Sequence, residues 1–312
     1  MVANDIMHKA KRGKNDEFFT RLTDISKELH NYDFHGKVVY LNCNDSPTTN
    51  FWRYFAQNAD GLGFSRLMST TYPAPAYLHE LVPSEGWPKV RVPLQGNGDF
   101  RSTEALGFWD EADVVVTNPP FSLFREYMQQ LDGSGKEFVI LGNSNAITYR
   151  EVWPMIQSGR MWLGVTGFNA GMCFYVPDGF EYSPTYIHER ERDGKPVARV
   201  SATCWFTNMD HKKRHEEIPL VQTYSAEKYP RYDNYDAVEV ARVKDIPVDY
   251  DGVMGVPITF LNNYNPEQFS ILGISESNVP GGSGRIWDAD SGTTHVMLRG
   301  VRKYARIFIT HK

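Results

Sequence analysis

The chain has 312 residues and a mass of 35.7 kDa, which suits one large α/β domain or two smaller ones and allows a sizeable core without disulfides. Hydrophobic residues make up 41% and charged residues 23%, a balance that excludes wholesale disorder. The net charge of −5 excludes a histone-like basic coat, while a local basic face stays compatible with nucleic-acid binding.

The cysteines and the termini indicate the compartment. The chain has only Cys43, Cys173 and Cys204, far apart and without a CxxC pair, so the sequence predicts neither a disulfide framework nor a zinc site. The N-terminal segment is polar and basic, and no apolar run is long enough to span a membrane. We therefore expect a soluble protein of a bacterial or phage-infected cytoplasm, with no metal and no membrane partner.

Short apolar runs alternate with helical stretches from about residue 36, which is typical of a parallel sheet flanked by helices. Strands are predicted at residues 37–41, 64–69, 90–94, 113–117 and 137–141. Helices are predicted at residues 48–57, capped by Asn44, Asp45 or Ser46, and at residues 122–131, capped by Ser122. The pattern predicts a mostly parallel central sheet.

The composition changes after about residue 160, where Gly, Pro, Tyr and Asp become frequent and a strand region is predicted at 197–206. We place a boundary near residue 207. The prediction is an α/β core over residues 14–207 and a mixed, loop-rich region over residues 208–312.

The sequence VVVTNPPFSLF, residues 114–124, is the most informative segment for function. Two consecutive prolines cannot continue a sheet, because neither has an N–H group to donate. They make the carboxyl end of the strand rigid, and that end is where open α/β sheets bind ligands. Pro119 also restricts Asn118 to an extended conformation, which fixes the direction of its amide.

These residue types suit a planar heterocycle that carries an amino group. The side-chain oxygen of Asn118 and the carbonyl of Pro119 can accept both N–H bonds of such an amine, and Phe121 can stack on the ring. Pro120 completes the rigid turn. The alternative is an ordinary junction between a strand and a turn.

The NPPF segment resembles motif IV of the amino-methyltransferases that use S-adenosylmethionine. The wider match resembles the EcoRI-type adenine-specific DNA methyltransferase family. The blocks that carry this resemblance are KNDEFFTRL (14–22), VVYLNCNDSPTTNFWRYF (38–55), GNGDF (96–100), VVVTNPPF (114–121), CWFTNMDHKKRHE (204–216) and GVPITFLNNYNPEQFSILG (255–273).

The resemblance implies a Rossmann-like S-adenosylmethionine-dependent methyltransferase fold with a C-terminal target-recognition region. It also implies the cofactor-binding residues, which are Asn15, Phe18, Thr20, Asn42, Asn44, Asp45, Asp99 and Asn118. The first strand is followed by LNCNDSPTTN, without the glycines usual among methyltransferases. A cytosine C5 enzyme would need a nucleophilic Cys, usually after Pro, and no cysteine here follows one, so transfer to an amino nitrogen is favoured.

Basic segments could hold duplex DNA through its phosphates. They lie at residues 1–14, 211–215 and 285–312, and the predicted contacts are Lys212, Lys213 and Arg214. The alternative for each cluster is a solvated surface. An adenine in a duplex cannot reach a pocket at a strand end, so the base would have to be flipped out. The loop GGSGR at 281–285 could insert into DNA or be a plain surface loop.

We therefore expect a monomeric, site-specific DNA adenine-N6 methyltransferase that uses S-adenosylmethionine and acts on a flipped adenine. Two alternatives remain open at this point. One keeps the chemistry with an RNA base or a protein glutamine as acceptor. The other is a non-catalytic protein of the same fold that binds DNA and opposes restriction.

Overall fold

A computed structural model of the chain describes residues 19–85, 90–168, 171–176, 188–190, 194, 196–200, 202–275 and 286–312. The chain forms two compact units. The first unit contains residues 1–144 and 164–209, and the second contains residues 145–163 and 210–312.

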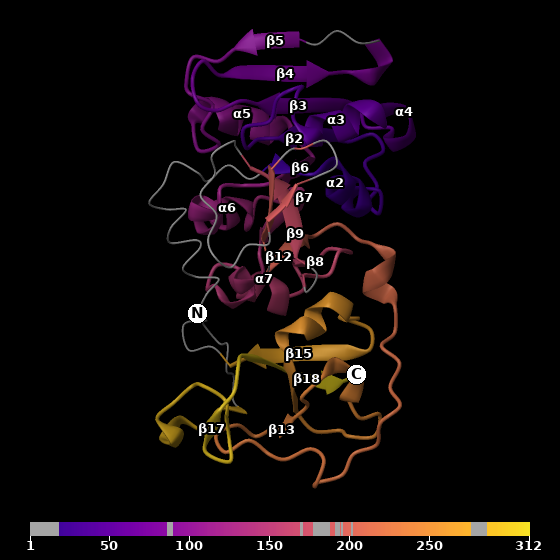
Figure 1. The fold of residues 1–312 in the computed structure, drawn as a ribbon, viewed down its shortest axis with the longest axis vertical. Coiled ribbons are helices and arrows are strands. Elements are labelled where there is room, and N and C mark those ends of the chain that lie inside the picture. Colours follow the sequence, from indigo (N-terminus) through magenta and orange to yellow (C-terminus); the bar gives the residue numbers. More distant parts are fainter. Residues whose placement is uncertain are drawn as a thin grey trace. The chain divides into compact units, whose positions relative to one another are not determined.

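The first unit is built on a large sheet whose strands lie in the order β5-β4-β3-β2-β6-β7-β12 (Figure 1). The four central strands are parallel: β3 (Arg66–Thr70), β2 (Val38–Leu41), β6 (Val114–Thr117) and β7 (Glu137–Asn143). The sequence predicted all four, since each is a run of apolar and β-branched residues. A mixed α/β architecture with a large multi-stranded sheet is confirmed.

Antiparallel strands flank this parallel centre. They are β4 (Tyr77–Leu81) and β5 (Val90–Pro93) on one side and β12 (Thr203–Thr207) on the other. The strand predicted at 90–94 is thus β5, and its partner β4 was not predicted. A hairpin joins β4 to β5 and needs no crossover helix, which accounts for the missing helical signal between them.

Helices pack on this sheet and bury their apolar faces. They are α2 (Leu22–Leu29), α3 (Asn50–Gln57), α4 (Ala59–Leu62), α5 (Thr103–Glu111) and α6 (Phe124–Leu131). Phe51, Trp52 and Phe55 of α3 belong to the same core cluster as Val39, Val114 and other buried strand residues. Ser102 caps α5 by accepting a hydrogen bond from Ala105 N at 3.2 Å.

Two predicted helix caps were wrong. The N-cap of α3 is Thr49, while Asn44 takes a left-handed conformation (φ 61°) and its Oδ1 accepts a hydrogen bond from Tyr72 N instead. The helix predicted from Ser122 begins at Phe124, because Phe121–Leu123 forms the 3₁₀ turn η2 after the two prolines. Leu123 is therefore the N-cap of α6, and it provides no side-chain cap.

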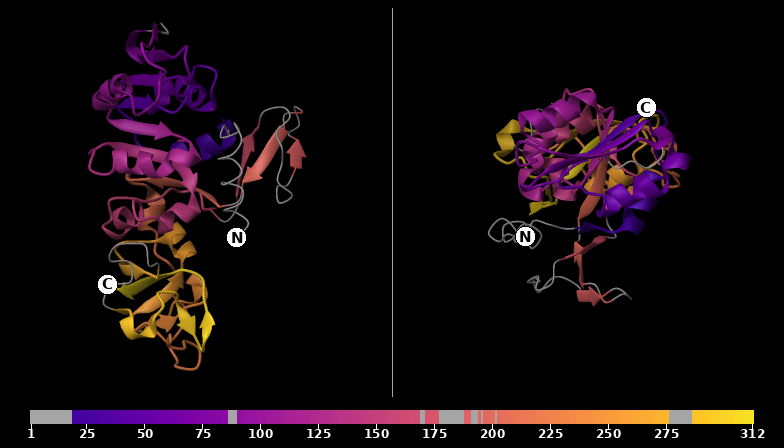
Figure 2. Two further views of the ribbon diagram at one scale, coloured as in Figure 1. Left: turned by 90° about the vertical axis from the view of Figure 1, so that its left-hand side faces the viewer. Right: turned by 90° about the horizontal axis from the view of Figure 1, so that it is seen from above.

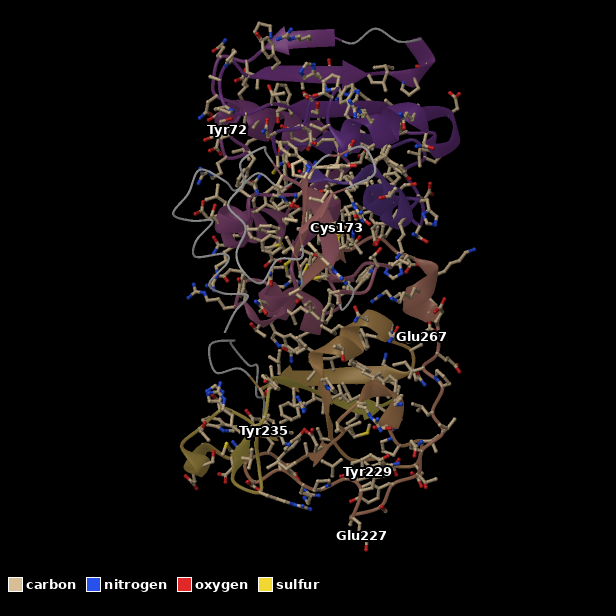
Figure 3. All side chains as sticks on the ribbon, in the orientation of Figure 1. Tyr72, Cys173, Glu227, Tyr229, Tyr235 and Glu267 are labelled. Atoms are coloured by element: carbon tan, nitrogen blue, oxygen red, sulfur yellow. The ribbon has the colours of Figure 1, made fainter. Side chains whose placement is uncertain are left out.

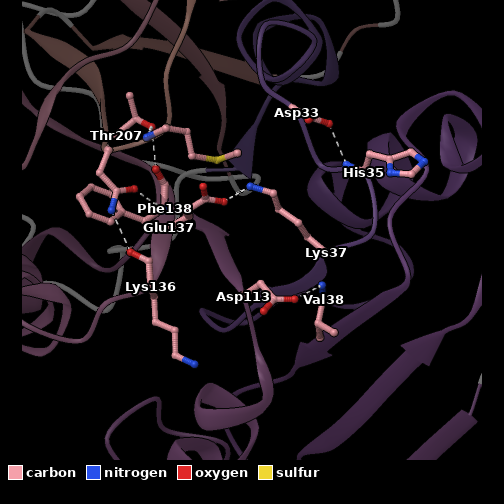
Figure 4. Close-up of polar contacts among 11 residues, drawn as sticks. Asp33, His35, Lys37, Val38, Asp113, Lys136, Glu137, Phe138 and Thr207 are labelled. Atoms are coloured by element: carbon pink, nitrogen blue, oxygen red, sulfur yellow. Dashed lines mark hydrogen bonds and ion pairs between the residues drawn. The ribbon is translucent and has the colours of Figure 1, made fainter.

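Polar contacts join the amino ends of the parallel strands (Figure 4). Asp113 Oδ2 accepts a hydrogen bond from Val38 N at 2.8 Å, and Lys37 pairs with Glu137. Thr207 Oγ1 donates to Phe138 O at 2.7 Å and so links β12 to β7. These contacts occupy the end of the sheet opposite to the one where ligands are expected to bind.

A second, small sheet belongs to the same unit, in the order β1-β9-β11-β10. Its strands are β1 (Phe19–Thr20), β9 (Met172–Tyr175), β11 (Pro196–Val200) and β10 (His188–Arg190). Figure 2 shows it to one side of the large sheet. The single strand region predicted at 197–206 was wrong: it is divided between β11 and β12, which belong to different sheets, and Ala202 between them has a φ of 67°.

The second unit has its own sheet, in the order β13-β14-β18-β15. Its elements are α7 (Trp153–Gln157), β8 (Trp162–Leu163), β13 (Val238–Glu239), β14 (Met254–Pro257), β15 (Phe269–Ile274), β16 (Met297–Leu298), β17 (Val301–Arg302) and β18 (Arg306–His311). Tyr232, Tyr235 and Phe308 form part of its apolar core.

The 3₁₀ turns of the chain include η1 (Pro83–Glu85), η3 (Ser144–Thr148), η5 (Lys212–His215), η6 (Val243–Asp245), η7 (Ile258–Asn263) and η9 (Ala289–Ser291).

The chain passes from the first unit into the second after Met209. The chain also enters the second unit earlier, because residues 145–163 belong to it. The division of function between residues 14–207 and 208–312 stays a prediction.

Candidate active site

The NPPF segment lies directly after β6, whose four residues are all buried. The two prolines end the strand, and Leu123 N then donates to Pro120 O at 3.0 Å to close the η2 turn. The amide of Asn118 comes within hydrogen-bond distance of the next segment of the site, with Nδ2 3.5 Å from Thr20 Oγ1. The turn therefore carries residues 118–121 as one rigid group at the carboxyl end of the sheet.

A cavity of about 640 Å³ lies at this end of the first unit. It brings together nine of the predicted site residues: Thr20, Asn42, Asn44, Asp45, Asp99, Asn118, Pro119, Pro120 and Phe121. Four separate stretches of the chain supply them, because the parallel strands β2 and β6 end at the same edge of the sheet. Asn15 and Phe18 lie outside the described residues.

Asn42 provides a buried polar group in the cavity wall. Its side chain is 1% exposed, and Oδ1 accepts a hydrogen bond from Tyr127 Oη at 2.7 Å. Its Nδ2 is a buried donor for which no hydrogen-bond partner occurs among the described residues. A buried N–H group that lacks a partner is costly, so this donor fits a ligand that brings an acceptor into the cavity.

The pKa values of two carboxyl groups in the cavity are shifted in opposite directions. Burial raises the pKa of Asp45 to about 7, against a smaller lowering by the Thr49 hydroxyl. The pKa of Asp99 is lowered because the guanidinium of Arg101 binds it, with Nε 2.9 Å from Oδ1 and Nη2 2.7 Å from Oδ2. Asp99 is therefore a fixed, ionised acceptor, whereas Asp45 can change its charge near neutral pH.

The residues of the cavity wall that the sequence reasoning missed include Phe19, Tyr72 and Arg101. Phe19 and Tyr72 line the cavity and expose 43% and 44% of their surface. Figure 3 labels Tyr72, and its backbone N is held by Asn44 Oδ1 at 3.1 Å. The sequence signal that could have identified Tyr72 is an aromatic residue just after the end of β3.

The predicted DNA-contacting residues lie in the η5 turn of the second unit. Lys212 is exposed, whereas Arg214 is half-buried with its guanidinium carbon 3.7 Å from the centre of the Trp162 ring. Burial lowers the pKa of Arg214, against a smaller opposing effect of Asp210. The role of Lys212, Lys213 and Arg214 in DNA binding stays a prediction.

Two further properties concern only the residues that the structure describes. Among them, no group of three or more His, Cys, Asp or Glu side chains is arranged to hold a metal ion. Within the same residues, no helix is both long enough and apolar enough to cross a membrane.

The known proteins to which this chain is similar are methyltransferases. The profile of the family described as "Adenine-specific methyltransferase EcoRI" matches residues 6–86 and 78–312. The chain is 40% identical to type II methyltransferase M.EcoRI of Escherichia coli, covering 89% of this chain and 93% of that protein. It is 37% identical to type II methyltransferase M.MpnI of Mycoplasma pneumoniae, covering 85% of this chain and 84% of that protein. No solved structure matches the chain significantly.

The first unit combines an α/β sheet with an NPPF turn that lines a cavity, and the family match defines the class of the protein as a methyltransferase. The chain belongs to the EcoRI family of adenine-specific methyltransferases. It is a DNA adenine methyltransferase, and neither an RNA or protein acceptor nor a non-catalytic role is favoured.

Proposed function

We propose that the cavity of the first unit binds S-adenosylmethionine together with one extruded adenine and transfers a methyl group to N6 of that adenine. The observation that supports this most is that a single cavity joins the NPPF turn to Thr20, to the 42–45 segment and to Asp99. Direct transfer requires the amine and the methyl donor to be held next to each other. We accordingly assign the fold to the Rossmann-like methyltransferases that use this cofactor.

On the amine side, Asn118 and Pro119 are the proposed acceptors. The amide nitrogen of Asn118 faces Thr20 Oγ1, so the side-chain oxygen is the atom that we assign to the target amine. Together with the Pro119 carbonyl it holds both N–H bonds and directs the nitrogen lone pair out of the ring system. Phe121 stacks on the base. The nitrogen loses its proton to solvent after transfer, so no side chain has to act as a base.

On the cofactor side, the cavity residues provide the hydrogen-bond partners and the apolar surface that S-adenosylmethionine, a cationic nucleoside with an amino-acid group, requires. Bound S-adenosylmethionine supplies an electrophilic methyl group on its sulfonium. Asp99, fixed by Arg101, accepts a hydrogen bond from an amino or hydroxyl group, and Asn42 Nδ2 donates one. The exposed faces of Phe19 and Tyr72 offer apolar surface for a purine ring. Asn44 and Asp45 line the same wall, and Asn15 and Phe18 are proposed to complete the cofactor site.

The proposed substrate is duplex DNA. A base stacked in a duplex cannot enter a cavity at a strand end, so the adenine is flipped out before transfer. Lys212, Lys213 and Arg214 are proposed to contact phosphates, which position the duplex without reading its sequence. We propose that the enzyme acts as a monomer on the DNA of a bacterial or phage-infected cytoplasm, as part of restriction and modification.

Transfer of tritium from methyl-labelled S-adenosylmethionine tests this function. The wild-type chain is incubated separately with duplex DNA, RNA and protein, with Asn118→Ala as the matched control. We expect label in DNA only, recovered as N6-methyldeoxyadenosine after digestion, and very little from the control. Labelled RNA or protein with unlabelled DNA would overturn the proposal. Cofactor binding without transfer to any acceptor would also contradict it and would favour a non-catalytic role.

A further inference from the structure

A short, tightly turned hairpin stands out in the second unit. Strands β16 and β17 pair Met297 with Arg302 and Leu298 with Val301, and only Arg299 and Gly300 connect them. Both connecting residues have positive φ, 52° and 73°, as a two-residue turn between twisted strands requires. A bulky residue such as Arg rarely takes this conformation, so something must hold the turn. β17 is labelled in Figure 1, and the hairpin is drawn in yellow in Figure 2.

Asp233 holds the tip of this hairpin. Its Oδ1 accepts a hydrogen bond from Arg299 N at 3.0 Å, and its Oδ2 accepts one from Gly300 N at 2.7 Å. Asp233 N donates to Met297 O at 2.9 Å, and the neighbouring Asn234 Oδ1 accepts from Met297 N at 2.9 Å. Four hydrogen bonds from one segment therefore fix the tip and the first strand, so the side chains that point outward come from a rigid base.

The outward side chains of this hairpin are positively charged. Arg299 and Arg302 are exposed, Lys303 is half-buried, and none of the three forms an ion pair within the part of the chain that the structure describes. Three other arginines of this unit do form ion pairs: Arg231 with Asp236, Arg242 with Asp245, and the buried Arg306 with Glu239. The acidic group at the turn, Asp233, is bound to backbone amides rather than to the arginines.

The hairpin also exposes apolar surface. Val301 is 60% exposed and Tyr304 is 90% exposed, among the highest values for large hydrophobic residues of the described chain. An exposed aromatic ring and an aliphatic side chain beside three free cations are not explained by the packing of the unit. They match a partner that presents phosphates together with the apolar faces of sugars.

We infer that the β16–β17 hairpin is a docking element for duplex DNA. A two-stranded ribbon is narrow enough to follow a DNA groove. Arg299, Arg302 and Lys303 contact phosphates on the flanks of the groove, and Val301 and Tyr304 pack against deoxyribose. This inference rests on the proposed function, because it takes the DNA substrate as the partner and adds the surface that receives it.

The test is the salt dependence of DNA binding, measured by fluorescence anisotropy between 50 and 200 mM salt on the full chain. The variant combines Arg299→Gln, Arg302→Gln and Lys303→Gln. The matched control removes three exposed charges elsewhere, by Lys27→Gln, Arg53→Gln and Lys244→Gln. Each phosphate contact contributes about 0.9 to the slope of log affinity against log salt, so three contacts contribute about 2.7. We expect the affinity advantage of the wild type over the hairpin variant to shrink about 40-fold across this range.

The control should leave the slope nearly unchanged. Tyr304→Ala should weaken binding at every salt concentration without altering the slope, which separates the apolar contact from the ionic ones. An unchanged slope in the hairpin variant, or an equal change in the control, would overturn the inference. Cofactor binding by calorimetry and melting temperature verify that each variant is folded. If the wild type itself neither bound nor methylated DNA, the proposed function would fail; if it did both while the hairpin variant matched it, only the hairpin would be excluded.

Discussion

Asn118 is the residue on which the proposed chemistry depends most directly, because its carboxamide oxygen is the proposed acceptor for the target amine. Asn118→Ala removes the side-chain acceptor and leaves the Pro119-Pro120 turn in place, because the backbone bond from Leu123 N to Pro120 O does not involve the side chain. Loss of one preorganised polar group of this kind lowers turnover by about 10²–10³-fold. We expect single-turnover methylation to fall by this factor while cofactor affinity stays near that of the wild type.

Phe121→Ala serves as the contrasting variant at the same turn. The ring stacks on the target base in the proposed complex, and such stacking is worth roughly 1–3 kcal/mol. This variant should keep a measurable rate at saturating DNA and need more DNA to reach it. Circular dichroism establishes that both variants fold. A folded Asn118→Ala enzyme with near-normal turnover would remove this amide from the mechanism.

The buried carboxyl of Asp45 predicts a pH effect on stability. Its pKa is about 7 in the folded chain against an ordinary value of 3.8, so the folded state binds more proton than the unfolded state between these two values. This group therefore lowers the free energy of unfolding as pH rises from about 4 to about 7. The pKa difference of about three units sets an upper bound of roughly 4 kcal/mol on the effect.

Urea unfolding of wild type and Asp45→Asn at pH 5 and pH 8 measures this. The amide does not titrate, so its stability relative to the wild type should increase from pH 5 to pH 8. All other groups titrate in both chains, so their contributions cancel in the difference between the two free energies of unfolding. A constant difference across this range would show that Asp45 is already ionised at pH 5.

At the scale of elements, local patterns predicted strands better than their partners or ends. The run Val114–Thr117 is buried at every position, and its apolar pattern predicts a strand, as do the patterns of β2 and β7. The antiparallel β4 and the short helices α2 and α5 were not, because their apolar positions are few and their burial depends on the sheet they cover. Ser122 looked like a cap from its neighbours alone, but the rigid prolines before it force a 3₁₀ turn first.

The η5 turn shows a similar limit and gives a prediction. The sequence treats Lys212 and Arg214 alike, whereas the structure places Arg214 against Trp162 and leaves Lys212 exposed. Arg214→Gln should lower the free energy of unfolding of the chain by about 1 kcal/mol through loss of the cation–π contact. Lys212→Gln should leave stability unchanged and reduce the salt slope of DNA binding by about 0.9 if Lys212 contacts a phosphate. Urea unfolding and anisotropy measure the two effects, and an equal stability loss in both variants would contradict the assignment for Arg214.

At the scale of the whole molecule, the site was more predictable than the course of the chain. Nine predicted residues meet in one cavity because motif residues follow strand ends, and strand ends of a parallel sheet converge. The passage of residues 145–163 into the second unit could not be predicted, since its apolar residues, such as Trp153 and Ile156, would suit either core. The first unit is consequently discontinuous in sequence, and the chain re-enters it at Gly164.

Glu28 holds the chain at this point of re-entry through hydrogen bonds to its backbone. Its carboxylate is fully buried and accepts hydrogen bonds from Val165 N at 2.8 Å, Thr166 N at 2.8 Å and Tyr32 Oη at 2.6 Å. The backbone approaches so closely that a Cβ atom at Gly164 would lie 2.1 Å from Glu28 Oε1. A helix near the start of the unit thus holds the segment where the chain re-enters it, more than a hundred residues later.

Glu28→Ala should therefore destabilise the chain far more than a substitution on the surface of the same helix. It leaves two backbone donors and one hydroxyl buried without acceptors, and each such group costs about 1–3 kcal/mol, so we expect a loss of about 3 kcal/mol or more in the free energy of unfolding. Tyr32→Phe removes only one of the three donors and should cost about 1 kcal/mol, and Lys27→Ala, at an exposed position, should cost little. Urea unfolding of the three variants at pH 7 gives the order. If Glu28→Ala were no more destabilising than Tyr32→Phe, the re-entry segment would have to be held by the surrounding apolar core instead.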